Sequence, residues 1–357
     1  MAKLKTLPPD HAPLRVVAIG GGTGLSTLLR GLKRYVAAPA GTQPSVPGST
    51  SPSPGAAAPL IRDLAAVVTV TDDGGSSGRL REDLKMLPPG DVRNCMVALS
   101  EDEHLLSRLF QHRFAQGDLG GHSFGNLFVA ALTEITGDFA QAVQMASQVL
   151  ATRGRIYPAT NSNVTLAARM DDGSVVRGET NITASKQRIV ELTLDPPTAD
   201  PMPETIDAIA QADLITVGPG SLYTSLITNL LVRGIPEALA GAKATRVYIC
   251  NLMTQANESL GLTAAQHIEK ILEHVGAVKE PIFDYALINT APISAALSAR
   301  YAREGQEPIE ADLARIRSLG VEPITGAFVH EGDLLRHDYD SLTERLLELS
   351  LATAARR

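Results

Sequence analysis

The stretch from Val67 to Arg81 brings together more groups capable of chemistry than any other part of the chain. It reads VVTVTDDGGSSGRLR, so two carboxylates follow an apolar run and precede glycines, serines and two arginines. Carboxylates can hold Mg²⁺ or accept hydrogen bonds from sugar hydroxyls, and glycine-rich backbone and arginines can bind phosphate oxygens. The stretch predicts a site for a phosphorylated ligand, with Asp72 and Asp73 as candidate metal ligands. An N-cap beside a solvated charge is the structural alternative.

The residues before the two aspartates indicate how they are positioned. The run of β-branched residues that precedes Asp72 favours a strand buried on both faces of a parallel sheet. Asp72 and Asp73 would then lie at the carboxyl end of that strand. Open α/β sheets bind their ligands at this edge.

A glycine turn near the start of the chain is a second candidate element. Residues 14–19 (LRVVAI) predict a strand, residues 20–24 (GGGTG) a turn, and residues 26–35 a helix. The spacing does not match the G-x-G-x-x-G dinucleotide fingerprint, because position 25 is leucine. Glycines at a helix start still let backbone N–H groups approach a phosphate. A tight turn without a ligand is the alternative.

The same arrangement recurs two hundred residues later. Residues 214–217 predict a strand, residues 218–221 (GPGS) a turn and residues 221–232 a helix, with Ser221 as its N-cap. Two such turns facing one crevice would suit a diphosphate better than a single phosphate. An N-cap with no ligand is again the alternative.

The histidines and the potential nucleophiles give weaker evidence for a functional site than the glycine turns do. His122 precedes a helix that begins near Gly125 and Asn126, and an asparagine there could hydrogen-bond to a uracil or a sugar hydroxyl. The eight histidines show no metal-binding spacing, so a packing role is the alternative for His122. No nucleophile elbow, Walker A pattern or Cys/His arrangement occurs. Catalysis through a covalent intermediate is therefore not expected.

The remaining patterns predict an α/β fold. A helix-rich section covers residues 95–150, and an Asp-Gly turn at residues 171–173 predicts a hairpin of residues 163–170 and 174–179. Strands and helices then alternate as in a mostly parallel sheet. The predicted strands are 189–194, 214–217, 246–250 and 285–289, and the predicted helices are 103–114, 127–135, 139–150, 204–212, 264–275 and 343–354.

Composition excludes some classes of function. The chain has 357 residues and a formal net charge of -7, which argues against a nucleic-acid-binding surface. Cys95 and Cys250 lie in apolar runs and are expected to be buried free thiols of a reducing compartment. Because no signal peptide or run of about 20 apolar residues occurs, we expect a cytoplasmic protein without membrane insertion. We expect one domain over residues 1–357, with a flexible Pro/Ser/Ala-rich insertion at 37–59.

At these motifs the chain resembles the YvcK-like gluconeogenesis factors of bacteria, relatives of the CofD 2-phospho-L-lactate transferases. The matching segments occur in family order: 20–25 (GGGTGL), 71–81 (TDDGGSSGRLR), 88–94 (PPGDVRN), His122 with Gly125 and Asn126, 218–224 (GPGSLYT) and 250–255 (CNLMTQ). Two departures are the long insertion and Ser123, which stands where the family pattern has Asn. The second weakens the role assigned to the His122 loop.

The resemblance implies a Rossmann-like fold with helices on both faces of the sheet. It also implies a cytoplasmic protein linked to growth on gluconeogenic carbon sources and to cell shape, which binds UDP-sugars such as UDP-N-acetylglucosamine. The transferase relatives instead move a phospholactyl group onto a deazaflavin with Mg²⁺. A nucleotide-sugar-binding regulatory protein is therefore the leading hypothesis, and an Mg²⁺-dependent transferase is the alternative. A nicotinamide dinucleotide enzyme is a third, which Leu25 already disfavours.

Together the motifs and the resemblance define a set of candidate site residues. The backbone of the two glycine turns would hold the diphosphate, Arg79 or Arg81 would neutralise it, and carboxylates and asparagines would recognise base and sugar. The catalytic residues, if any, and the oligomeric state, a homo-oligomer included, stay open. The candidate ligand-binding residues are Gly21, Gly22, Thr23, Gly24, Asp72, Asp73, Gly75, Ser76, Ser77, Arg79, Arg81, Asp91, Arg93, Asn94, His122, Asn126, Gly218, Pro219, Gly220, Ser221, Thr224, Asn251 and Thr254.

Overall fold

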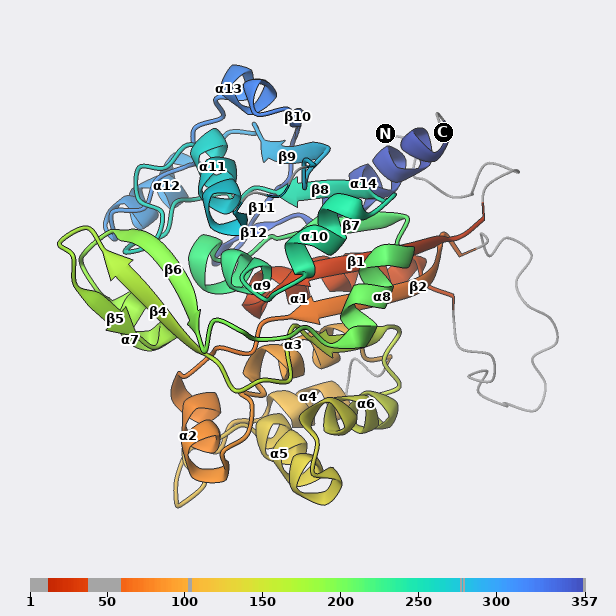
Figure 1. The fold of residues 1–357 in the computed structure, drawn as a ribbon, viewed down its shortest axis with the longest axis vertical. Helices are drawn as coiled ribbons and strands as arrows, with labels where there is room; N and C mark the ends of the chain where they lie inside the picture. Colours follow the sequence, from red (N-terminus) through yellow and green to blue (C-terminus); the bar gives the residue numbers. More distant parts are fainter. Residues whose placement is uncertain (1–11, 38–58, 102–104, 277, 279, 356–357) are drawn as a thin grey trace.

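A seven-stranded parallel sheet forms the centre of the computed structural model (Figure 1). The structure describes residues 12–37, 59–101, 105–276, 278 and 280–355, so most of the predicted insertion at 37–59 lies outside the described residues. The strand order is β10-β9-β8-β7-β1-β2-β3. The bounds are β1 (Leu14–Gly20), β2 (Ile61–Val68), β3 (Arg155–Pro158), β7 (Leu214–Val217), β8 (Thr245–Ile249), β9 (Tyr285–Asn289) and β10 (Glu322–Gly326).

Alternation along β1 explains why its residues from Val16 to Ile19 are all apolar. Val16 and Ala18 pack into one hydrophobic core, whereas Val17 and Ile19 pack into the other. Because β1 pairs in parallel with both β2 and β7, it lies inside the sheet. Its residues 16–19 are buried on both faces. In β2, Ala66 and Val68 pack into the first core and Ala65 and Val67 into the second, so the predicted burial of this strand on both faces is confirmed. The strand ends at Val68, before the two threonines that precede Asp72.

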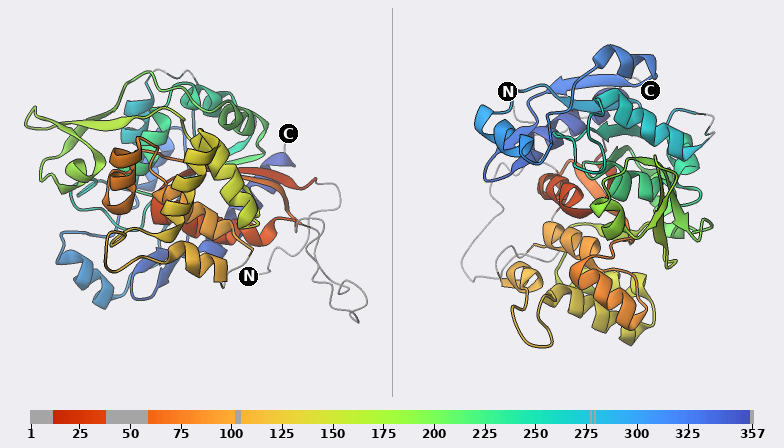
Figure 2. Two further views of the ribbon diagram at one scale, coloured as in Figure 1. Left: turned by 90° about the horizontal axis from the view of Figure 1, so that it is seen from below. Right: turned by 90° about the vertical axis from the view of Figure 1, so that its left-hand side faces the viewer.

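Helices cover both faces of the sheet, as predicted. The right-hand view of Figure 2 shows α1 on one side and the helices of residues 203–241 on the other. The first layer comprises α1 (Gly22–Leu32) with its 3₁₀ extension (Lys33–Tyr35), α3 (Gly90–Leu99), α4 (Leu105–Gln111), α5 (Phe124–Thr136), α6 (Phe139–Val149) and α14 (Tyr339–Ala354). The second comprises α8 (Pro203–Gln211), a π-helical segment (Leu222–Ile227), α9 (Thr228–Leu230), α10 (Ile235–Gly241), α11 (Ala264–Val275) and α13 (Leu313–Ser318).

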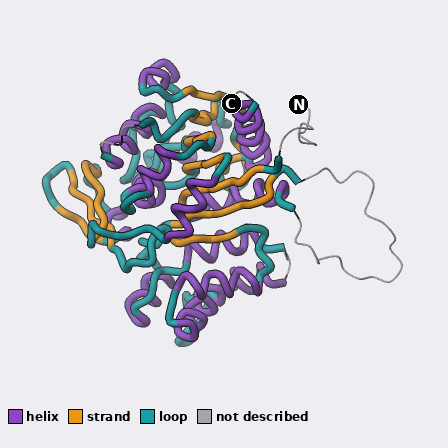
Figure 3. The backbone as a smooth tube through the Cα atoms, turned by 45° about the vertical axis from the view of Figure 1, so that its right-hand side comes forward, coloured by secondary structure: helices purple, strands orange, loops and turns teal. Residues whose placement is uncertain are grey.

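A small antiparallel sheet projects from the edge toward which the strands of the large sheet point (Figures 1 and 3). It has the order β5-β4-β6, and the predicted Asp-Gly turn joins its first two strands, with Gly173 at a φ of 84°. The bounds are β4 (Thr165–Met170), β5 (Val175–Arg177) and β6 (Ile189–Asp195). The predicted hairpin is therefore confirmed.

The remaining elements are α2 (Gly75–Leu84), α7 (Glu179–Ala184), α12 (Ala295–Ala302) and the hairpin of β11 (Val329–Glu331) and β12 (Leu335–His337). No helix was predicted where α2 lies, because its first turn is Gly-Ser-Ser-Gly and favours turns. Strand β12 packs against α1, although some three hundred residues separate them. None of the helices in the described part of the chain is both long and apolar enough to cross a membrane.

Candidate ligand-binding site

The two glycine turns meet at the carboxyl edge of the sheet. A Cβ atom on Gly24 would lie 2.3 Å from the Pro219 carbonyl oxygen, so only glycine fits between the turns. The Asn251 amide braces the second turn by donating to the Gly220 carbonyl (2.7 Å) and accepting from the Gly220 N–H (3.3 Å). Residues 21–24, 219–221 and Asn251 line one cavity of about 340 Å³, which we call the phosphate cavity. The predicted convergence of the turns is confirmed.

Several residues that line the phosphate cavity were missed by sequence analysis. They are Thr27, Ser225, Leu252, Met253, Gln255, Tyr301, Leu335, Arg336 and His337. The exposed Arg336 side chain forms no hydrogen bond or ion pair with any described residue. It therefore offers five donors to an anion in the cavity. The only sequence signal was an Arg-His pair shortly before a helix, and pairing with β11 is what brings it to the site.

His337 supplies a hydrogen-bond acceptor, whereas Arg336 supplies donors. Its Nε2 lies 3.1 Å from the Cys250 carbonyl oxygen, which can only accept, so Nε2 carries the proton. Burial lowers the pKa of His337 to about 4, and the ring is neutral at pH 7. Its Nδ1 is therefore a hydrogen-bond acceptor beside the phosphate cavity.

A carboxyl group lies directly behind the first glycine turn. Asp91 accepts a hydrogen bond from the Gly22 N–H at the start of α1. A Cβ atom on Gly21 would lie 2.8 Å from Asp91 Oδ2 and 2.6 Å from Thr69 Cγ2. Desolvation, and then the nearby Asp72 charge, raise the pKa of Asp91 to about 7. Asp91 therefore places a titratable group against the anion-binding end of α1.

The pKa values of two further carboxyl groups near the start of α1 are raised, which favours their neutral forms. Burial raises the pKa of Glu179 well above its usual value, and the Asp91 and Asp72 charges add to the shift. Glu179 accepts a hydrogen bond from the Thr71 hydroxyl at 3.1 Å. Burial also raises the pKa of Glu258, which accepts from the Thr224 hydroxyl at 2.9 Å. We call the group formed by Asp72, Asp91 and Glu179 the acidic edge.

The paired aspartates do not face one another. Asp72 Oδ1 accepts from the Gly74 N–H at 2.9 Å, whereas Asp73 Oδ1 accepts from the Thr180 N–H at 2.8 Å and the Thr180 hydroxyl at 2.6 Å. Asp73 thus holds the start of α7. Within the described ranges, no three His, Cys, Asp or Glu side chains are grouped so as to hold a metal ion. Asp72 and Asp73 therefore contact different parts of the protein, and their role as Mg²⁺ ligands stays a prediction.

The predicted arginines contact protein groups. Arg81 donates to Asn163 Oδ1 at 2.9 Å, to Thr165 Oγ1 at 3.1 Å and to the Val164 carbonyl, which ties α2 to β4. Arg79 donates to the Gly120 carbonyl at 2.9 Å. Neither side chain lines the phosphate cavity.

The His122 loop forms a separate buried network. His122 Nδ1 lies 3.1 Å from the Ser76 hydroxyl, to which the Asn126 amide also donates at 3.1 Å. Ser123 accepts from the Asn126 N–H at 3.3 Å and so caps α5. Asn126 Oδ1 is buried without a hydrogen-bond partner among the described residues.

The remaining predicted site residues lie next to the glycine turns or the His122 network, or contact neighbouring protein groups. Ser77 lies within 3.5 Å of the Asn126 amide, Gly75 begins α2, and Gly218 precedes the turn with a φ of 96°. Ser221 is the N-cap residue of the π-helical segment, as predicted, but its hydroxyl accepts from Gln255 Nε2 and makes no capping hydrogen bond. Arg93 donates to Asn94 at 2.8 Å, and the Thr254 hydroxyl accepts from the Glu307 N–H at 3.0 Å.

Comparison with known proteins places this geometry in a family. Residues 16–329 match the family model described as 2-phospho-L-lactate transferase CofD. The gluconeogenesis factor of Halalkalibacterium halodurans is 46% identical over 335 residues, 93% of this chain and 95% of that protein. The gluconeogenesis factor of Bacillus subtilis is 45% identical over 337 residues, 94% of this chain and 98% of that protein.

Solved structures agree with this placement. A crystal structure of a Bacillus halodurans protein superposes with a TM-score of 0.84 at 45% identity, covering 94% of this chain and all of that one. The glycine turns and the acidic edge lie within the matched region. The chain belongs to the CofD family, and within it this protein is similar to the bacterial proteins named gluconeogenesis factor.

Proposed function

We propose that this protein is a cytoplasmic regulatory protein that binds a nucleoside diphosphate sugar of the UDP-N-acetylglucosamine type in the phosphate cavity. Binding would couple the level of that ligand to growth on gluconeogenic carbon sources and to cell shape. The similarity to gluconeogenesis factors supports the metabolic part of the proposal. The ligand is argued from the cavity itself.

The meeting of two glycine turns on one cavity is the observation that supports the ligand best. The turn at residues 21–24 opens α1, whose N-terminal N–H groups favour an anion. The turn at residues 219–221 adds a second backbone wall, and Arg336 adds a cation without an internal partner. Two phosphates side by side would use both walls, because each wall can contact one of them. The volume of about 340 Å³ is in the usual range for small-molecule sites.

The proposal is tested by isothermal titration calorimetry, which measures the binding of UDP-N-acetylglucosamine with and without Mg²⁺. We expect binding in both conditions, and the absence of heat in both would overturn it. In the Arg336→Ala variant we expect affinity to fall on the order of tenfold to a hundredfold, because hydrogen bonds to charged groups are worth about 1.5–3 kcal/mol. Arg317→Ala is the matched control, since Arg317 is exposed and pairs with Glu322.

Phospholactyl transfer is a second candidate, which the CofD family match favours. Its test is incubation of the protein with a nucleoside-diphosphate-linked phospholactate, a deazaflavin acceptor and Mg²⁺. Formation of the phospholactyl deazaflavin would establish transfer. The absence of product, together with UDP-sugar binding that survives chelation, would leave the regulatory function.

A further inference from the structure

The helices α4, α5 and α6 form a surface layer that carries very little charge. They have 7, 13 and 11 residues, yet Arg108 in α4 and Glu134 in α5 are their only charged side chains. Charged residues make up 20% of the whole chain, a far larger share than in these helices. The outer face of a helix that contacts only water normally carries charged and polar residues. The composition of this layer therefore differs from that of an ordinary solvent-facing surface.

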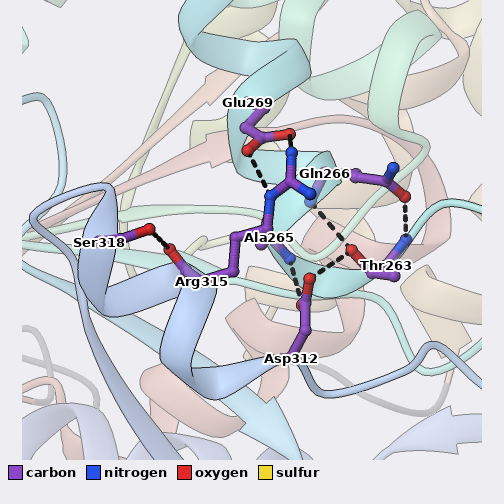
Figure 4. A network of polar contacts seen from close by, with 7 residues as sticks. All are labelled: Thr263, Ala265, Gln266, Glu269, Asp312, Arg315 and Ser318. Atoms are coloured by element: carbon purple, nitrogen blue, oxygen red, sulfur yellow. Dashed lines mark hydrogen bonds and ion pairs between the residues drawn. The ribbon is translucent and has the colours of Figure 1, made fainter.

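A second pair of surface helices shows the usual pattern. Helices α11 and α13 have 12 and 6 residues and carry five charged side chains. Arg315 donates to both carboxylate oxygens of Glu269, at 2.7 and 2.9 Å, and Asp312 accepts from the Ala265 N–H at 2.8 Å (Figure 4). The α11–α13 surface is therefore typical of one that faces water, whereas the α4–α6 layer is not.

Helix α5, at the centre of this layer, is apolar on its inner and its outer face. It packs against both α4 and α6, and its inner face buries Val129. Its outer face leaves Phe128 and Leu132 half-buried and Ala131 and Ile135 exposed, and 74% of Ile135 is accessible to solvent. The left-hand view of Figure 2 shows α5 and α6, in yellow, at the surface of the molecule. Because a helix that is hydrophobic all round is normally buried, α5 has the composition of a helix covered by a further protein surface.

The apolar character extends to the neighbouring helices. Leu109 in α4 and Met145 and Val149 in α6 are exposed, and we call these three residues with Ala131 and Ile135 the apolar face. Six of the eleven large apolar side chains that the described residues expose lie between residues 105 and 149. Three helices about 10 Å apart, the longest about 20 Å in length, offer on the order of 600 Å² of surface. Two such surfaces together reach the lower limit of about 1,200 Å² for a stable interface.

The charges of the layer favour a second copy of this chain as the occupant of the apolar face. The whole chain has a formal net charge of -7, so two copies repel one another over much of their surfaces. In the α4–α6 layer the single cation, Arg108, and the single anion, Glu134, cancel. A twofold interface brings the same patch of both copies together, so an apolar patch with one charge of each sign is complementary to itself.

We propose that the apolar face is the interface of a homodimer, in which the two α5 helices pack antiparallel across a twofold axis. The Phe110 ring of α4 contacts the rings of Phe124 and Phe128, with centroids 5.9 and 5.1 Å apart, so α4 lies beside the N-terminal half of α5. Glu134 lies near the C-terminal end of α5. The antiparallel arrangement therefore brings Glu134 of each copy toward Arg108 of the other. Because no residue of these three helices lines the phosphate cavity, the proposal is independent of the proposed function.

Analytical ultracentrifugation over a series of protein concentrations tests the interface. We expect the wild type to sediment at high concentration as a dimer of twice 37.7 kDa. Ile135→Glu should raise the dissociation constant of the dimer by at least about tenfold, because a carboxylate buried without a partner is costly. Val175→Glu, at an exposed position of β5, is the matched control and should dimerise as the wild type does. A wild type that stays monomeric, or a dimer unaffected by Ile135→Glu, would overturn the proposal.

Cross-linking tests the pairing of the α5 helices in a different way. Cys95 and Cys250 are both buried, so Ala131→Cys introduces an exposed thiol near the middle of α5. A short bismaleimide should join two copies of this variant into a covalent dimer, whereas the Val175→Cys variant should stay uncoupled. Circular dichroism shows that each variant is folded. Equal cross-linking of both variants, or none in Ala131→Cys, would contradict the interface.

Exchange of the two charges tests the antiparallel orientation. Arg108→Glu or Glu134→Arg alone brings like charges together at the interface, so each should weaken the dimer by a few-fold, in keeping with the modest worth of exposed ion pairs. The double variant restores opposite charges and should dimerise about as strongly as the wild type. The dissociation constants are measured by ultracentrifugation at low salt, where the effect is least screened. A double variant weaker than either single variant would show that the two side chains do not meet and would overturn this arrangement.

Discussion

The phosphate cavity and the acidic edge lie side by side at the carboxyl ends of the strands, yet their polar groups are used differently. Around the phosphate cavity, Arg336 and His337 Nδ1 have no partner among the described residues. Around the acidic edge and its neighbours, Asp73, Arg81 and Glu179 are hydrogen-bonded to protein groups. In the first region unpaired polar groups line a cavity, whereas in the second these side chains hold the fold together. The predictions below test that division.

The largest effect is expected at Asp91, where the two regions meet. The pKa of Asp91 is about 7 in the folded protein against an ordinary value of 3.8, so the folded state binds the proton more tightly between these values. Stability should therefore fall as pH rises from about 4 to 7, by up to about 4 kcal/mol from this group. Asp91→Asn should remove that part of the slope, as measured by urea unfolding across this pH range. Equal slopes for both proteins would contradict the burial of an uncompensated carboxylate.

The next effect concerns the contact between the glycine turns. Gly24→Ala places a Cβ atom 2.3 Å from the Pro219 carbonyl oxygen, so the turns must separate. We expect a loss of about 1–3 kcal/mol in unfolding free energy and loss of UDP-sugar binding by calorimetry. Gly241→Ala is the control, since no atom lies within 4 Å of the added Cβ, and it should be neutral or slightly stabilising. Retained affinity in Gly24→Ala would show that the turns need not meet.

Arg81 separates a structural role from a ligand-binding role. Because its guanidinium ties α2 to β4, Arg81→Ala should lower the free energy of unfolding by about 1.5 kcal/mol. Its UDP-sugar affinity should stay within about twofold of the wild type, in contrast to Arg336→Ala. Thermal unfolding and calorimetry on the same preparation decide between the roles. A large loss of affinity without a loss of stability would return Arg81 to the ligand site.

The smallest effect is expected at Ser123. Ser123→Ala removes the acceptor for the Asn126 N–H at the start of α5, which should cost about 1 kcal/mol of stability. Ser123→Asn, which introduces another residue favoured at N-caps, should keep the cap and serves as the control. Chemical denaturation of the three proteins measures the difference. A ligand affinity that changes with the Ser123→Ala variant would connect the His122 loop to the cavity.

Local patterns predicted much of the fold. The strands 214–217 and 285–289 and the helix 264–275 have the predicted bounds, because each is a short apolar run or an amphipathic segment bordered by turn or capping residues. Helix α2 was missed because its first turn is rich in glycine and serine. Its stability comes from contacts such as that of Arg81 with β4, which no local pattern records.

The candidate site could be predicted only where it depends on backbone chemistry. Glycines after a strand and before a helix indicate an anion-binding turn wherever the chain goes next, so both turns were found. The arginine that lines the cavity could not be predicted in this way. Three arginines and several carboxylates lie in the motifs, but hydrogen bonds within the protein occupy Arg79, Arg81 and Arg93. Arg336 was not considered, because hairpin pairing more than a hundred residues after the second turn brings it to the cavity.

The sequence by itself determined the alternation of strands and helices, the two glycine turns and the edge of the sheet at which they open. These features follow from the conformational preferences of neighbouring residues. Tertiary structure alone decided that the turns share one cavity, that Arg336 and His337 complete it, and that Asp91 titrates near neutrality. Each of these depends on distances and desolvation between residues far apart in the chain, which no local preference encodes.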